Sequence, residues 1–151
     1  MISENIEKSL NSQIKLEAQA SMQYLAMASW AEINGYNGVA GFFYNQSEEE
    51  TMHMLKLIKF VNERGGTAVI PALGKPESEF ESLQELFTTF LSKEETVTHN
   101  VNQIVFECLE VKDYTTHNFM QWYVAEQTEE EALARTILDK LRIIGDDKGG
   151  L

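Results

Sequence analysis

A glutamate and a histidine three residues apart, Glu50 and His53, interrupt an apolar stripe with helical spacing in the stretch NQSEEETMHML. Residues three and four apart share one helix face, so both side chains are predicted to point inward and Glu48 outward. A lone E-x-x-H pair is more often solvated than metal-binding, so a metal site is indicated only if other helices bring further ligands to the same level. If the pair is buried, carboxylate oxygens with one imidazole suit a divalent metal such as Fe²⁺, Mn²⁺ or Zn²⁺.

Three further apolar stripes are each interrupted by a carboxylate near their midpoint. The interruptions are Glu17, Glu94 and Glu130, and Gln127 lies one turn before Glu130. Four clustered carboxylates repel one another, and two divalent ions would balance their charge, so the stripes predict a di-metal site inside a helical bundle. Glu94 alone could be a boundary residue. Tyr24, two turns beyond Glu17, could hydrogen-bond a ligand, act as a redox-active phenol, or simply pack in the core.

Four long helices are expected to position these residues. Their predicted extents are from near Ser3 to about Ile33, about Val39 to Arg64, Ser82 to about Val111, and Asp113 to about Ile144. The end signals are the glycines at 35, 65, 66 and 145 and the capping residues Ser82 with Glu85, and Asp113. The pattern therefore predicts an all-α protein.

The connection between the second and third helices, roughly residues 65–81, is much longer than the other two. An extended chain of about 16 residues reaches about 53 Å, whereas a helix of about 27 residues is about 40 Å long. The connection can therefore cross the whole bundle and make the second and third helices parallel. Its apolar stretch TAVIPAL is expected either at a subunit contact or simply covering the core.

Composition restricts the class of protein further. A length of 151 residues suits one domain over residues 1–151, and 43% hydrophobic residues with only 2 prolines favour helices. A formal charge of −12 argues against nucleic acid or an anionic membrane as partner. The single cysteine, Cys108, excludes an internal disulfide and a CxxC motif. A secretory signal and a membrane-length apolar run are both missing from the sequence, so we expect a soluble cytoplasmic protein.

The sequence closely resembles the bacterial non-haem ferritins over essentially its whole length. The matching stretches are LEAQASMQYLAMASW, SEEETMHMLKLI, SLQELF and HNFMQWYVAEQTEEEALARTILDKL. The resemblance implies a ferritin-like four-helix bundle and a homo-oligomeric cage of 24 subunits. It also implies that iron is the partner: Fe²⁺ would be oxidised with O₂ or H₂O₂ and stored as a ferric mineral.

The resemblance also implies roles for individual residues. By matching position, Glu17, Glu50 and His53 would hold a first iron, with Glu50 bridging to a second. Glu94 and Glu130 would hold that second iron, with Gln127 beside it. A third iron site would be formed by Glu49, Glu126 and Glu129. Glu130 would be a ligand of both this site and the second iron.

Several departures bear on alternative functions. Bacterioferritins have a second E-x-x-H where this chain has Gln127-Thr128-Glu129-Glu130, so a permanent di-iron cofactor is not expected. Thr51 stands where the bacterioferritin haem methionine would align, with Met52 one position later, so no haem is expected. A rubrerythrin-type peroxidase would need a rubredoxin module with four cysteines, and this chain has one. A structural or signalling bundle with accidental carboxylates is the alternative from another class.

The carboxyl end differs most from the ferritins that the sequence resembles. Those proteins generally continue past the equivalent of Gly145 into a short fifth helix that lines the four-fold pores, whereas this sequence reads GDDKGGL. Six residues that include two glycines are expected to be irregular. We therefore expect a cage with open four-fold pores, with an isolated dimer as the alternative.

Overall fold

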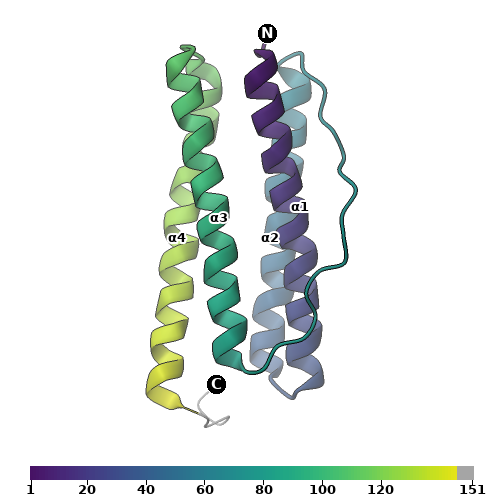
Figure 1. Cartoon of the computed structure of the whole chain (residues 1–151), viewed down its shortest axis with the longest axis vertical. Coiled ribbons are helices and arrows are strands. Elements are labelled where there is room, and N and C mark those ends of the chain that lie inside the picture. Colours follow the sequence, from purple (N-terminus) through teal and green to yellow (C-terminus); the bar gives the residue numbers. More distant parts are fainter. Residues whose placement is uncertain (146–151) are drawn as a thin grey trace.

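The computed structural model describes residues 1–145, which form four helices joined by two short turns and one long crossover (Figure 1). The helices are α1 (Glu4–Ile33), α2 (Asn37–Glu63), α3 (Leu83–Glu110) and α4 (Tyr114–Ile144). No strand occurs within these residues. The predicted all-α class is confirmed, while the prediction of an irregular tail concerns residues 146–151, which lie outside the described part.

Side-chain caps start three of the helices, and two of the capping residues, Ser82 and Asp113, are the ones predicted. The Ser3 hydroxyl accepts a hydrogen bond from the Ile6 amide at 3.3 Å, and the Asp113 carboxylate accepts one from the Thr116 amide at 3.0 Å. Ser82 accepts from the Glu85 amide at 3.1 Å. The returning bond of the predicted capping box goes one residue further back than expected, because the Glu85 carboxylate accepts from the amide of Glu81 at 2.8 Å.

Helix α2 begins at Asn37, two residues before the predicted Val39. Gly35 adopts a φ of +83°, which reverses the chain so tightly that the amide of Tyr36 donates to Ala31 of α1 at 2.8 Å. The carbonyl of Tyr36 then accepts the first helical bond of α2, from Ala40. One residue therefore both closes α1 and opens α2, which shortens the turn.

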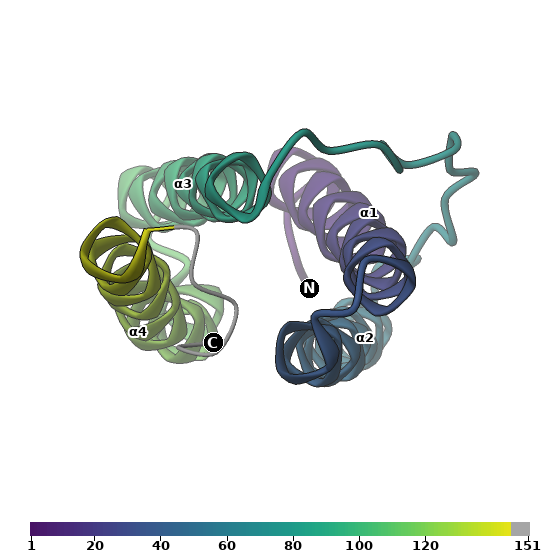
Figure 2. The same ribbon diagram turned by 90° about the horizontal axis from the view of Figure 1, so that it is seen from below.

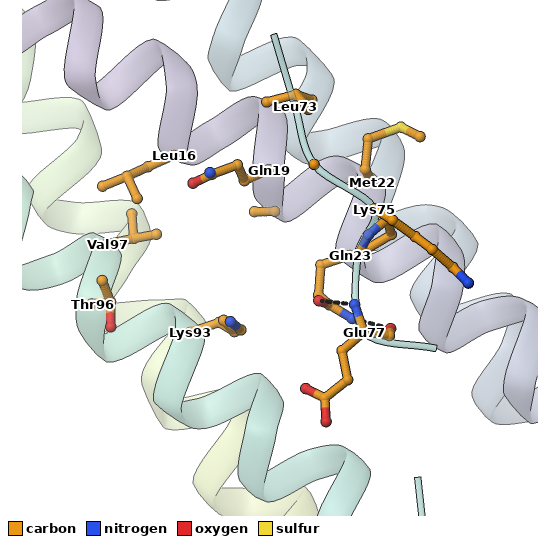
Figure 3. Close-up of a pocket in the computed structure, with 13 residues that line it drawn as sticks. Leu16, Gln19, Met22, Gln23, Leu73, Lys75, Glu77, Lys93, Thr96 and Val97 are labelled. Atoms are coloured by element: carbon orange, nitrogen blue, oxygen red, sulfur yellow. Dashed lines mark hydrogen bonds between the residues drawn. The ribbon is translucent and has the colours of Figure 1, made fainter. Parts of the chain in front are cut away.

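The crossover between α2 and α3 runs the length of the bundle, so α2 and α3 are parallel as predicted (Figure 1). It lies on the outer side of α1, away from α4 (Figure 2). Two side-chain amides of α1 hold the crossover. The Asn11 side chain donates to the backbone carbonyl of Thr67 and accepts from the backbone amide of Val69. The Gln23 side chain donates to the backbone carbonyl of Glu77 and accepts from its backbone amide (Figure 3). Val69 and Ile70 of the TAVIPAL stretch remain 56% and 70% exposed.

The apolar interior is divided into two parts. The lower core, near the foot of the bundle in Figure 1, is rich in aromatic rings and includes Tyr24, Phe43, Phe87 and Phe90. The upper core is mainly aliphatic and includes Ile6, Leu10, Leu57, Val101 and Ile104. Between the two cores lies a set of buried polar side chains that we call the polar layer: Gln13, Glu17, Gln46, Glu50, His53, Glu94, Gln127 and Glu130.

No helix within residues 1–145 has a stretch both long and apolar enough to cross a lipid bilayer.

Candidate metal centre

Each of the four helices contributes one carboxylate to the polar layer, at the midpoint where the stripes predicted it. Glu17 comes from α1, Glu50 from α2, Glu94 from α3 and Glu130 from α4, and each is at most 5% exposed. His53 and Gln127 are buried in the same layer, whereas Glu48 is exposed on the opposite face of α2. The inward orientation predicted from helical spacing is therefore confirmed for all six side chains.

Glu17, Glu50 and His53 form the tightest cluster in this layer. The Nδ1 atom of His53 lies 3.5 Å from Oε2 of Glu17 and 3.4 Å from Oε2 of Glu50. Each residue offers one ligand atom, and these atoms all lie within 4.8 Å of one another. Helical spacing places Glu50 and His53 on adjacent turns of α2, and α1 packs against that face. Two carboxylates and one imidazole so arranged are suited to binding a single divalent cation.

The backbone and ring of His53 are held from α4. The hydroxyl of Tyr123 donates to the backbone carbonyl of His53 at 2.7 Å. The imidazole packs edge-on against the ring of Trp122, with centroids 5.1 Å apart, and its Nε2 lies 4.0 Å from a carboxylate oxygen of Glu126. The Tyr123 hydrogen bond and the Trp122 ring hold His53 where its Nδ1 faces Glu17 and Glu50.

Glu94 is held differently, because both of its carboxylate oxygens have donors. Tyr24 donates its hydroxyl hydrogen to Oε1 at 2.5 Å, and the Gln127 amide donates to Oε2 at 3.0 Å. The same Gln127 amide also contacts the Glu94 carbonyl and the Thr98 hydroxyl, each at 3.1 Å. Burial and the charge of Glu94 raise the pKa of Tyr24 well above its usual range, so the phenol stays protonated and able to donate.

Several atoms of the polar layer have no hydrogen-bond partner within residues 1–145. They are Oε2 of Glu17, both carboxylate oxygens of Glu50, Nδ1 of His53, Oε2 of Glu130 and Oε1 of Gln46. A buried polar atom without a partner costs about 1–3 kcal/mol. Five of these six atoms are potential metal ligands, so bound cations would satisfy the atoms that the protein itself leaves unpaired.

The electrostatics of the layer favour protons when cations are absent. Burial and the neighbouring Glu17 raise the pKa of Glu50, and burial with the charges of Glu94 and Glu49 raises that of Glu130 to about 8. Burial also raises the pKa of Glu94, despite its two donors. For Glu17, burial is outweighed by its contacts with Glu50 and His53, which lower the pKa. Cations entering the layer would therefore displace protons from Glu50 and Glu130.

We expect the metal-free protein to lose stability as pH rises from 4.5 towards 8. The pKa of Glu130 is about 8 in the folded chain against an ordinary 4.5, so the folded state binds more protons than the unfolded state in this window. The free energy of unfolding then falls with pH. Replacing Glu130 with glutamine should flatten the decline, as measured by urea unfolding at several pH values. Replacing the exposed Glu48 with glutamine should not, and equal slopes in the two variants would contradict the assignment.

The three further carboxylates predicted for a third iron lie in less buried positions. Glu49 and Glu126 are half-buried. A carboxylate oxygen of Glu126 lies 4.0 Å from Nε2 of His53, and Glu49 directly precedes the buried Glu50 on α2. Glu129 is exposed on α4. The structure thus brings Glu49 and Glu126 to the edge of the layer and leaves Glu129 facing outward.

Two contributors were not identified as functional from the sequence. Gln13 donates to Oε1 of Glu17 at 2.8 Å, and its signal was available, since it lies one turn before Glu17 on the same stripe. The second is Trp122, whose ring contacts His53, while the Lys56 ammonium lies 3.6 Å from the centroid of the Trp122 ring. Helical spacing within α4 does not reveal that contact, which depends on how α4 packs against α2.

A cavity of about 430 Å³ lies outside the polar layer, between α1, α3 and the crossover (Figure 3). Leu16, Val97, Gln19 and Lys93 are among the residues that line it. The carboxylates of the polar layer are not among its lining residues. The chemistry of the site therefore belongs to the bundle interior and not to this cavity.

The four-helix fold agrees with comparisons between this chain and known proteins. The family model described as "Ferritin-like domain" matches residues 7–144. A probable bacterial non-heme ferritin-like protein of Haemophilus influenzae is 44% identical over 151 residues, which are 100% of this chain and 92% of that protein. A bacterial non-heme ferritin of Campylobacter jejuni is 40% identical, again over 100% of this chain and 90% of that protein.

Solved structures give the same result. The open pore ferritin of the hyperthermophilic archaeon Archaeoglobus fulgidus superposes with a TM-score of 0.97 at 41% identity, covering 99% of this chain and 93% of that one. The ferritin of Chlorobium tepidum gives a TM-score of 0.94 at 40% identity, covering 99% and 91%. With its four-helix fold, its buried carboxylates and these full-length similarities, the chain belongs to the ferritin-like family.

Proposed function

We infer that this chain is an iron-storage ferritin that oxidises Fe²⁺ at the polar layer and deposits the product as a ferric mineral. The observation that carries this conclusion is the set of four buried carboxylates with one imidazole, five of whose ligand atoms have no hydrogen-bond partner within residues 1–145. A bundle with only a structural role would gain stability by replacing these groups with apolar side chains. Keeping them is consistent with transient occupation by cations.

Iron is the substrate in this scheme, and its proposed ligands are the buried groups of the polar layer. They are Glu17, Glu50 and His53 for the first iron, and Glu50, Glu94 and Glu130 for the second, with Gln127 beside it. Bridging by Glu50 would hold the two ions about 3.5–4 Å apart, as in other two-metal sites. The amide donors on Glu94 and Glu17 would keep these carboxylates oriented while iron passes through.

The electron balance of the reaction requires two irons. Each Fe²⁺ gives one electron, and the pair reduces O₂ with two protons to H₂O₂, or H₂O₂ with two protons to two waters. Glu50 and Glu130 have raised pKa values and would release protons as iron binds. Tyr24 would stay a hydrogen-bond donor to Glu94, which makes it a positioning residue for the second iron.

An anaerobic Fe²⁺ titration followed by admission of air tests the proposed function. A ferritin should bind two or more Fe²⁺ per subunit, show a transient absorbance within seconds, and then develop the amber colour of a ferric mineral. A structural or signalling bundle should bind no iron specifically and show only the slow oxidation of free Fe²⁺. The second result would overturn the proposal.

We propose a third iron site at the edge of the polar layer, formed by Glu49, Glu126 and Glu129 with Glu130 shared. Replacing Glu49 or Glu126 with alanine should leave the fast oxidation of the first two irons largely unchanged, because neither side chain is among the buried ligands proposed for those irons. The number of irons oxidised per O₂ should change, as measured with an oxygen electrode. An unaltered binding stoichiometry of three Fe²⁺ per subunit in both variants would argue against this site.

We also propose that the chain assembles into a cage of 24 subunits in the cytoplasm. Exposed apolar side chains on α1 and the crossover, including Met22, Leu25, Val69 and Ile70, provide a surface that assembly would cover. Cys108 is fully buried inside its own bundle, so its thiol is not presented to a neighbouring subunit. Native mass measurement separates the cage from the alternative, since a population confined to dimers would rule the cage out.

A further inference from the structure

Two amide side chains connect Glu17 to the partly exposed face of α3. Asn100 donates from Nδ2 to Oε1 of Gln13 at 2.6 Å, and Gln13 donates from Nε2 to Oε1 of Glu17 at 2.8 Å. Gln13 is fully buried, whereas Asn100 is half-buried. The chain of bonds therefore runs from the surface of α3, across α1, to one oxygen of a carboxylate in the polar layer.

The direction of this chain is favoured from both of its ends. A glutamine amide has a donor end and an acceptor end that differ little in shape, so Gln13 could present either end to Glu17. The Glu17 carboxylate only accepts, and Asn100 places a donor against Oε1 of Gln13, so both neighbours favour the orientation in which Nε2 faces Glu17. If the amide were turned over, its carbonyl oxygen would face the carboxylate oxygen, and the two acceptors would repel each other.

Glu17 is the residue whose geometry this bond determines. With Oε1 held by Gln13, the carboxylate presents its other oxygen, Oε2, towards the cluster, 3.5 Å from Nδ1 of His53. Oε2 has no hydrogen-bond partner within residues 1–145. One oxygen of Glu17 is thus held by the protein and the other is left for a metal ion. Glu50 differs, because neither of its carboxylate oxygens has a hydrogen-bond partner within residues 1–145.

We propose that Gln13 and Asn100 are positioning residues for the first iron, acting through Glu17. They orient the carboxylate so that a single oxygen completes the ligand set offered by Glu50 and His53. The inference rests on the proposed function, because it needs a metal ion at this cluster. Outer hydrogen-bond partners of metal ligands typically change metal affinity by roughly 10–100-fold when they are replaced.

The test compares two charge-matched variants by calorimetric titration of the full-length protein with Co²⁺, which binds such sites without being oxidised in the assay. Asn100→Asp keeps the size of the side chain but offers only acceptors, so it should draw Nε2 of Gln13 towards itself and turn the Gln13 carbonyl to Glu17. Asn102→Asp adds the same charge at an exposed position two residues along α3. This control leaves Asn100 and its hydrogen bond to Gln13 in place.

We expect Asn100→Asp to weaken binding of the first Co²⁺ by roughly tenfold. The visible absorption band of the first bound Co²⁺ should change in intensity, because the coordination of this ion changes. The second Co²⁺ should bind as it does to the unmodified chain. Asn102→Asp should bind both ions as tightly as the unmodified chain or slightly more tightly, because added negative charge attracts cations. A purely electrostatic role for position 100 predicts tighter binding in both variants. A purely packing role predicts no change in Asn100→Asp, whose side chain has nearly the same shape.

A third variant covers the case in which Asn100→Asp does not fold. Asn100→Ala removes the donor without supplying a competing acceptor, so it should weaken the first Co²⁺ less than Asn100→Asp does, yet measurably. Wild-type affinity for the first Co²⁺ in the folded Asn100 variants would overturn the positioning role. If the unmodified chain binds no Co²⁺ at micromolar concentration, the proposed function itself fails, which is a different outcome.

Discussion

Replacing Glu50 with alanine is expected to lower the initial rate of Fe²⁺ oxidation by more than roughly 100-fold, since even outer-sphere partners of metal ligands are worth 10–100-fold. Both carboxylate oxygens of Glu50 lack a hydrogen-bond partner within residues 1–145, and Glu50 is the only side chain proposed to contact both irons. Its loss should therefore impair both sites at once. Stopped-flow absorbance after mixing Fe²⁺ with oxygenated buffer measures this rate.

The matched control for this variant is Glu48→Ala, two residues earlier on the exposed face of α2. It should oxidise Fe²⁺ at the rate of the unmodified chain. The fold of Glu50→Ala should be intact, and its metal-free form more stable than the unmodified chain, because a buried carboxylate beside Glu17 is removed. Equal oxidation rates in the Glu48 and Glu50 variants would refute the bridging role.

Zn²⁺ in large excess at neutral pH is expected to raise the thermal midpoint of the metal-free protein by roughly 10–20 °C. Occupation of one site at about 100 times its dissociation constant stabilises the folded state by about 2.7 kcal/mol, so two sites contribute about 5 kcal/mol. For a chain of this size each kcal/mol shifts the midpoint by about 2–4 °C. Differential scanning calorimetry with and without Zn²⁺ measures the shift.

The Glu50→Ala variant again provides the comparison for this second prediction. Its metal-free midpoint should be higher than that of the unmodified chain, and its response to Zn²⁺ much smaller, because the bridging ligand is missing. A Zn²⁺ response of the same size in both proteins would show that the metal stabilises the chain somewhere other than the polar layer.

The four helices and the level of the site were predictable because one physical rule governs both. An apolar stripe with helical spacing marks the buried face, and a charged residue within the stripe must then be buried as well. Glu17, Glu50, Glu94 and Glu130 were found in this way, and the structure places all four where the stripes do. Their role as iron ligands stays a prediction that the Glu50 variant tests.

Contacts between helices were less accessible from the pattern. Helical periodicity fixes which face of α4 is buried, but not its register against α2, so the bond from Tyr123 to the His53 backbone and the contact of Trp122 with His53 could not be derived. The pairing of Gln13 with Asn100 depends in the same way on how α3 lies beside α1. The early start of α2 follows from the tight turn at Tyr36 and not from any feature of the stripe.

The division of the interior into an upper and a lower core affects how the chain opens locally. Apolar packing transmits cooperativity, and the polar layer interrupts that packing across the whole cross-section of the bundle. We therefore expect each half of the metal-free chain to open as a separate unit, with its own protection of backbone amides against hydrogen exchange. Ions bound by ligands from all four helices would couple the two units, so exchange in both halves would slow together when the layer is filled.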